Sequence, residues 1–283
     1  MSQSSFRYTF RPGENIREEF LRLLALLSAQ TSRLVPCPPQ VLPESIHYAR
    51  TLIKRTRSFL WFGRSVLGPV ASIRLRRRLR NAAQFLAASR DRTAIQSTLK
   101  KLAQDTSSSR DREALALFAV ILMEKPTKFG ASVKSLHDPL LKAVQFLLRA
   151  LEEMSQIAVA STLPWPDPSE RLAKAFRVVR KVGKKAQHMG TDFQFHEWRK
   201  KAKRLLHQLE LIHDPSDKRS LRTIKHVDRL QEKLGDYHDC VVVQDRLRKL
   251  FKMYPQTTRL IALLEKRKKH LGKKAQKLRT LFK

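Results

Sequence analysis

The chain has 283 residues, 42% of them hydrophobic, so it is long enough and apolar enough to bury a substantial core. It carries 58 Lys and Arg against 25 Asp and Glu, a formal net charge of +33, which indicates a polyanionic partner: nucleic acid, an anionic membrane face or a phosphate polymer. Aromatic residues make up only 7%, and the tyrosines and tryptophans follow no regular stacking pattern, which disfavours a protein that reads single-stranded bases.

Cysteine usage and hydropathy exclude further kinds of protein. The two cysteines, Cys37 and Cys240, lie far apart and outside any CxxC motif, so the sequence predicts neither a zinc site nor a disulfide framework. The N-terminal MSQSSFRYTF lacks the apolar core of a signal peptide, and no run approaches the roughly 18 apolar residues of a membrane span. We therefore expect a cytoplasmic protein with no cofactor, no metal and no membrane contact. The sequence sets no oligomeric state.

Few glycines and a 3.6-residue apolar period predict an all-α chain. In the first half we expect a helix that follows residues 12–15 and ends near 32, then helices over about 45–63, 69–102 with a bend near 89–91, 112–124 and 132–160. The segment DTSSSRD (105–111) is expected to be a loop.

Residues 162–168, TLPWPDP, form the clearest boundary, because their prolines cannot continue a helix. They divide the chain into two expected helical bundles, residues 1–162 and 163–283. Beyond the boundary the pattern predicts helices near 168–188, 193–213, 217–235, 237–254 and 256–281.

Two of the expected helices carry a basic face opposite an apolar one. In residues 46–57, IHYARTLIKRTR, an arc of about 80° holds His47, Arg50, Lys54 and Arg57. Residues 195–207, FHEWRKKAKRLLH, repeat the design with His196, Arg199, Lys200, Lys203 and His207. Like charges packed on one helix face are unfavourable unless an anion lies among them. The faces therefore predict anion binding, although Lys and Arg also fill ordinary solvated helix surfaces.

Further basic residues are weaker candidates. Among the arginines at 74–80 we select Arg77 and Arg80, which share an arc with Gln84. The last helix is basic all round and is expected to be mostly solvated surface, with Lys269 and Lys273 on the binding face. Three acids lie among the cations, Asp91, Asp236 and Asp239, and they either hold Arg or His side chains in position or cap helices.

The two basic segments belong to an internal repeat. His47 aligns with His196, and at the same offset Arg50 meets Arg199, Lys54 meets Lys203 and Arg55 meets Arg204. Farther along, LAASRDRTAI (86–95) aligns with LGDYHDCVVV (234–243). Two matches in register, separated by similar lengths, indicate a duplication.

A doubled His-x-x-Arg-x-x-x-Lys-Arg, each copy followed by a Leu-rich helix and an (R/H)D pair, resembles the CHAD family, the conserved histidine α-helical domain. The resemblance implies two four-helix bundles related by a pseudo-twofold axis, a basic central cavity, and non-catalytic binding of long-chain inorganic polyphosphate. It implies a role for the matching residues His47, Arg50, Lys54, Arg55, Arg57, His196, Arg199, Lys203 and Arg204. Where the family often has a further basic residue, this chain has Leu206.

On this resemblance we expect a polyphosphate-binding protein that is not an enzyme and is targeted to polyphosphate granules. A nucleic-acid or ribosome-associated basic protein is the first alternative, because the charge suits it. A phosphohydrolase is the second, because the histidines and the His238–Asp239 pair resemble metal-dependent HD hydrolases. Charge reversal at Arg50 with Arg199 is expected to abolish binding. Replacement of Lys266 and Lys268 is expected to have little effect.

Overall fold

The computed structural model describes residues 8–124, 137–212, 217–250, 254 and 257–279, and these ranges are helical and contain no strand. The elements, in chain order, are α1 (Ile16–Ser32), the 3-10 turn η2 (Pro39–Val41), α2 (Leu42–Phe62), α3 (Arg64–Leu67), α4 (Pro69–Phe85), α5 (Ala88–Asp105), α6 (Ser109–Glu124), α7 (His137–Ala160), α8 (Pro168–Met189), α9 (Asp192–Ile212), α10 (Lys218–Leu250) and α11 (Thr257–Arg279). The predicted all-α class is confirmed. Among the helices so described, none combines the length and apolarity that a membrane span requires.

Two compact units divide the chain, and each is built from segments that are distant in sequence. Unit 1 comprises Met1–Ala87, Gly130–Lys174 and Arg204–Ile224. Unit 2 comprises Ala88–Phe129, Ala175–Lys203 and Lys225–Lys283. The boundary expected after residue 162 separates two copies of a sequence repeat. That division and the pseudo-twofold relation between the copies stay predictions.

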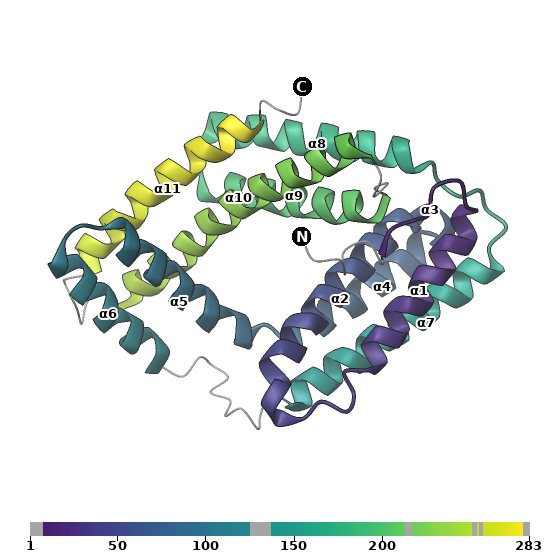
Figure 1. Cartoon of the computed structure of the whole chain (residues 1–283), viewed down its shortest axis with the longest axis horizontal. Coiled ribbons are helices and arrows are strands. Elements are labelled where there is room, and N and C mark those ends of the chain that lie inside the picture. The colour runs from purple at the N-terminus through teal and green to yellow at the C-terminus, as the bar shows by residue number, and fades with distance from the viewer. Residues whose placement is uncertain (1–7, 125–136, 213–216, 251–253, 255–256, 280–283) are drawn as a thin grey trace. The chain divides into compact units, whose positions relative to one another are not determined.

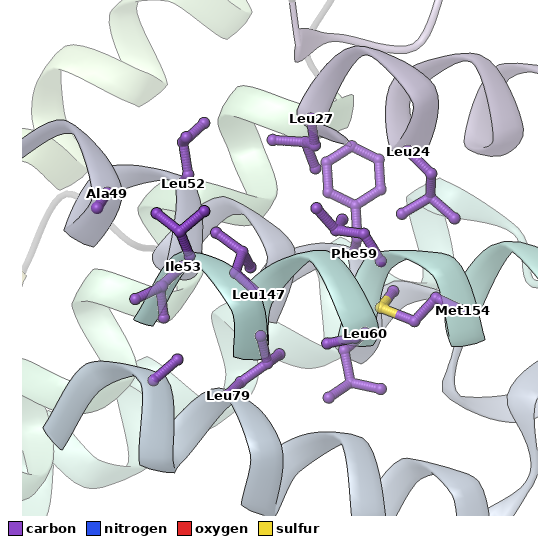
Figure 2. Close-up of a cluster of buried hydrophobic side chains, with 14 of the residues drawn as sticks. Leu24, Leu27, Ala49, Leu52, Ile53, Phe59, Leu60, Leu79, Leu147 and Met154 are labelled. Carbon is purple, nitrogen blue, oxygen red and sulfur yellow. The ribbon is translucent and has the colours of Figure 1, made fainter. Parts of the chain in front are cut away.

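Unit 1 is built on four helices, α1, α2, α4 and α7, which lie side by side (Figure 1). Leucines and aromatics at helical spacing turn one face of each helix toward a shared core. Figure 2 shows this core, in which the following side chains gather: Leu24 and Leu27 of α1, Leu52 and Phe59 of α2, Leu79 of α4, and Leu147 and Met154 of α7. Full burial of one such side chain contributes about 2 kcal/mol, so the core holds α2 firmly against α4.

The sequence sets both ends of α2. Pro43 lies in the first turn, where its missing N–H would have no helical partner in any case. At the other end, the backbone N–H of Gly63 donates to the Phe59 carbonyl at 2.8 Å. A Cβ at residue 63 would lie 2.9 Å from the Phe20 ring, so a glycine is needed for the close approach of α2 to α1.

The C-terminal half of α9 belongs to unit 1. The backbone N–H of Phe10 donates to the Leu211 carbonyl at 2.9 Å, and the Thr9 hydroxyl donates to the Glu210 carbonyl at 2.9 Å. The Leu211 side chain is part of the unit 1 core. These contacts place Arg204 in the same unit as α2 and α4.

In unit 2, aromatic side chains join α8, α9, α10 and α11. The Phe195 ring of α9 stacks on the Tyr237 ring of α10 with their centroids 4.4 Å apart. Two glycines allow α8 and α11 to approach α9 closely. A Cβ at Gly183 of α8 would lie 2.8 Å from the Trp198 ring, and a Cβ at Gly272 of α11 would lie 3.2 Å from the Phe195 ring. The apolar face predicted for α9 is therefore its packing face.

A buried polar network around Lys268 corrects the expectation that this lysine is surface. Its side chain is only 4% exposed. The ammonium group donates to Asp192 at 2.9 Å, to the Gln244 amide oxygen at 3.1 Å and to Glu265 at 3.3 Å. Tyr237 donates to Asp192 at 2.7 Å. Although burial alone would raise the pKa of Asp192, the hydrogen bonds from Tyr237 and Lys268 hold it below its ordinary value.

Three expected boundaries differ from the structure. The helix expected over 69–102 is interrupted at Leu86 and Ala87, between α4 and α5, slightly before the expected bend. The expected loop 105–111 is shorter, because α6 begins at Ser109. The helices expected over 217–235 and 237–254 form one helix, α10, which continues through Gly235. A helical glycine costs about 1 kcal/mol relative to alanine, and the packing of α10 overrides that cost.

Glu19 anchors the segment before α1. Its carboxylate, 1% exposed, accepts hydrogen bonds from the backbone N–H and the Nε of Arg11, each at 2.8 Å, and from Arg22 Nε and Nη2, each at 2.7 Å. Burial alone would raise the pKa of Glu19, but the bonds from Arg22 and Arg11 outweigh it and lower the pKa from 4.5 to about 2. The ionised carboxylate therefore stabilises the folded state.

We predict that Glu19→Gln lowers the free energy of unfolding at pH 7 by about 2 kcal/mol, the scale of hydrogen bonds to a charged group. Because the folded pKa is depressed, the contribution of Glu19 is complete above pH 4.5 and is lost as the pH falls toward 2. The difference between wild type and variant should therefore shrink over that window in urea unfolding. Glu18→Gln, at an exposed position, is the control. A difference that does not change with pH would contradict the assignment.

We predict that Lys268→Ala lowers the free energy of unfolding by about 3 kcal/mol, because it removes the cation from a buried network and leaves the carboxylates of Asp192 and Glu265 beside each other without it. Lys266→Ala, at an exposed position on the same helix, should change it by less than about 0.5 kcal/mol. Urea unfolding at pH 7 measures both variants. Equal midpoints for the two would show that the network does not stabilise the fold.

Candidate anion-binding site

Two arginines on the basic face of α2 donate hydrogen bonds to backbone carbonyls of α4 and of the residue that follows it. Arg50 Nη1 donates to the carbonyl of Leu86, the residue that caps the C-terminus of α4, at 2.5 Å. About two turns earlier in α4 and two turns later in α2, Arg57 Nη2 donates to the Leu79 carbonyl at 3.0 Å. A guanidinium has five N–H donors, so Arg57 keeps others for further acceptors. The two arginines are thus held in place by the same helix pair that forms the unit 1 core.

Arg57 lies near two arginines that belong to other helices. Burial lowers the pKa of the Arg57 guanidinium, and the neighbouring charges of Arg80 on α4 and Arg204 on α9 lower it further. A nearby carboxylate would act in the opposite direction. Within the described residues, neither Arg57 nor Arg80 forms an ion pair. All three arginines belong to unit 1 and were candidates from the sequence.

The other candidates on α2 and α4 have different surroundings. His47 and Arg77 are exposed and Lys54 is half-buried. The Arg55 guanidinium lies 3.9 Å from the centroid of the Tyr8 ring, a cation–π contact that holds the segment before α1. Burial, together with the hydrogen bond to Tyr48, raises the pKa of Tyr8 to about 12.

The neighbouring arginines Arg74 and Arg78 are ion-paired with Glu153 of α7, at 2.5 Å each. Glu153 therefore offsets one of their two positive charges within unit 1, whereas neither Arg77 nor Arg80 forms an ion pair within the described residues. The arc that selected Arg77 and Arg80 from the sequence separates the two classes of arginine.

In unit 2, the basic face of α9 lies beside α10. The Nδ1 atoms of His196 and His238 are 3.3 Å apart, and the two ring centroids are 4.6 Å apart. Arg199 is only 8% exposed. A Cβ at Gly235 of α10 would lie 4.0 Å from Arg199 Nε, an ordinary contact distance, so the guanidinium lies beside this glycine. Lys200 is exposed and pairs with Glu197 at 2.5 Å.

The corresponding arginines of the two copies have corresponding neighbours. Arg50 contacts Leu86, and Arg199 approaches Gly235, which follows Leu234, the aligned counterpart of Leu86. Each arginine therefore lies at the start of the second repeated motif of its own copy. The counterpart of His238 in the first copy is Arg90, whose side chain lies outside the described residues.

The remaining candidates are spread over both units. In unit 2, Lys203 is half-buried, whereas Lys269 and Lys273 are exposed on α11. In unit 1, Arg204 is exposed, and His207 Nδ1 lies 3.0 Å from a Glu210 carboxylate oxygen.

The three candidate acids have separate outcomes. Asp236 holds a cation as predicted, but its partner is Lys101, at 2.7 Å, and not an Arg or His. Asp239 is half-buried on α10. The side chain of Asp91 lies outside the described residues. Across the part of the chain that the structure describes, no three or more His, Cys, Asp or Glu side chains gather as metal ligands would.

Sequence reasoning missed two features. It gave His238 no role in anion binding, although His238 belongs to the (R/H)D pair of the second repeated motif. It also passed over α8, where Arg171 to Thr191 contains seven Lys and Arg and no acid. The absence of acids, which drew attention to α2 and α9, was the signal that could have identified α8.

Comparison with known proteins identifies the family. The CHAD domain family model matches residues 25–248, most of the chain. No curated protein and no solved structure matches it. CHAD domains are associated with polyphosphate-related proteins. The resemblance drawn from the doubled motif is confirmed, and the chain belongs to the CHAD domain family.

Proposed function

We propose that this protein binds long-chain inorganic polyphosphate without changing it chemically. The observation that carries the proposal is the convergence of Arg57, Arg80 and Arg204, from three helices, at one face of unit 1. Their mutual repulsion is relieved when an anion with several negative oxygens lies among them. The association of CHAD domains with polyphosphate-related proteins supports the same class of ligand.

The chemistry of the cluster suits a phosphate polymer. Such a polymer has no bases, so it is recognised through its phosphate oxygens alone, and the planar fork of arginine pairs well with them. Basic helices of about 20 residues extend about 30 Å, so a polymer can contact several side chains in succession. The affinity then comes from many moderate contacts.

A guanidinium cluster binds phosphate but provides no reactive group. Arginine keeps its proton at any physiological pH, so it acts neither as a general base nor as a nucleophile. The proposal of binding without catalysis rests on this chemistry. Binding of the polymer would also recruit the protein to cytoplasmic polyphosphate granules, which is part of the proposal. The basic central cavity implied by the family resemblance stays a prediction.

We expect the purified protein to bind long-chain polyphosphate more tightly than RNA of equal charge at the same salt concentration, because aromatic residues for base stacking are few, 7% of the chain, and its tyrosines and tryptophans follow no regular spacing. Calorimetry or filter binding measures both affinities. Equal or tighter RNA binding would favour a nucleic-acid-associated protein. Release of phosphate from the polymer with added magnesium or manganese would instead show a phosphohydrolase.

We expect Arg80→Gln with Arg204→Gln to weaken polyphosphate binding at least about tenfold, because each charge-assisted contact contributes about 1 kcal/mol or more. These exposed positions are better tests than reversal of Arg50 and Arg199, since a carboxylate at the buried Arg199 would destabilise unit 2.

The matched control is Arg149→Gln with Arg222→Gln, which removes the same charge from exposed positions on α7 and α10. Circular dichroism verifies that both double variants stay helical. An equal loss of affinity in the control would show that the protein attracts the polymer only through its net charge.

A further inference from the structure

The exposed side of α8 is basic along its length and takes no part in the site described above. Its face in unit 2 is formed by Arg177, Arg180, Lys181, Lys184, Lys185 and His188, all of them exposed. On a helix these residues fall within an arc of about 140° and extend over about 16 Å. They form a continuous stripe and not a scatter of charges around the helix.

This stripe is left without neutralising partners. None of its six residues forms an ion pair within the ranges 8–124, 137–212, 217–250 and 257–279. Some basic side chains elsewhere in the fold are paired, as with Arg78 and Glu153 or Lys268 and Asp192. Residues 177, 181 and 185 stand four apart, as do 180, 184 and 188, and like charges at that spacing destabilise a helix. The stripe therefore favours an anionic partner.

The stripe points away from the basic face of α9. Helix α8 packs on α9 through Gly183, opposite the stripe, against the Trp198 ring (Figure 1). Trp198 belongs to the apolar side of α9, and His196, Lys200 and Lys203 lie on the other side of that helix. The two basic faces thus lie on opposite sides of the α8–α9 pair, and one phosphate group cannot contact both.

The stripe is also not part of the repeated design. In the first copy, the helix that precedes the basic helix α2 is α1, which has Glu18 and Glu19 in its first turn and no basic residue in its last turn. Only the second copy carries a basic helix in this position. The charge on α8 is therefore an addition to the faces that the two copies share.

We propose that the exposed face of α8 is a second contact surface for the phosphate polymer, and that it is engaged only by chains long enough to reach it from the basic face of α9 in the same unit. This inference rests on the proposed function and adds that the affinity depends on the length of the polymer. A flexible polymer held at one site reaches a second at an effective concentration near millimolar, so modest contacts on α8 add substantially to the affinity. A short chain gains nothing from them.

The test is the triple variant Lys181→Gln, Lys184→Gln and Lys185→Gln, measured with chains of about ten and of several hundred phosphates at one salt concentration. We expect the affinity for long chains to fall about tenfold and that for short chains to stay within about twofold. The dependence of long-chain affinity on salt should weaken, because fewer counterions are released. Glutamine is a good helix former, and circular dichroism verifies the fold.

The matched control replaces Lys249, Lys266 and Lys274, which are exposed on α10 and α11, with glutamine. Unchanged long-chain affinity in the α8 variant, an equal loss in the control, or an equal loss for short and long chains would each overturn the inference while the proposed function stands. If the wild-type protein binds neither chain, the proposed function fails and the inference fails with it. A loss of affinity confined to RNA would show that α8 serves nucleic acid.

Discussion

Repulsion between like charges that the fold holds together is the constraint on which the rest of this structure depends. Arg57 and Arg80 stand near each other because their helices, α2 and α4, are fixed by the unit 1 core. Leu79 connects the core to the arginines, because its side chain lies in the core while its carbonyl accepts a hydrogen bond from Arg57. Each buried leucine contributes about 2 kcal/mol, and repulsion between partly solvated charges is a few kcal/mol at most. A core of many such residues can therefore hold cations together until a ligand neutralises them.

The 25 acids of the chain cannot neutralise its 58 basic residues, so where the acids lie decides where positive charge remains. The structure uses several of them at buried joints. Glu19 fixes the segment before α1, Glu153 joins α7 to α4, and Asp192 with Glu265 surrounds the buried Lys268. The carboxylates thus serve the packing of helices, and the outer faces of α4 and α8 keep their charge. The positive surface therefore results from where the acids lie as much as from the excess of Lys and Arg.

The sequence predicted the helices well because prolines, glycines and apolar periodicity act locally. It failed at Gly235, where packing of α10 overrides a helix-breaking tendency, and at Lys268, whose burial depends on acceptors from α9, α10 and α11. Arg57 and Arg80 were selected from the faces of single helices, and Arg204 was selected from the internal repeat. Their mutual proximity depends on how three helices pack, and no helical period contains that information. Likewise, a helical arc could not distinguish the exposed Lys200 from the buried Arg199.

The nature of the ligand explains why basic residues are distributed instead of gathered in one pocket. A phosphate polymer repeats a single group, so a tight pocket for one phosphate gains no more from the rest of the chain. Many separate contacts of moderate strength let affinity grow with the number of phosphates and let the polymer exchange among equivalent registers. The arginines of α2, which donate hydrogen bonds to the carbonyls of Leu86 and Leu79, and the exposed stripe of α8 then differ in kind. The first are held in a fixed geometry, and the second provides charge that a long chain finds after it is already bound.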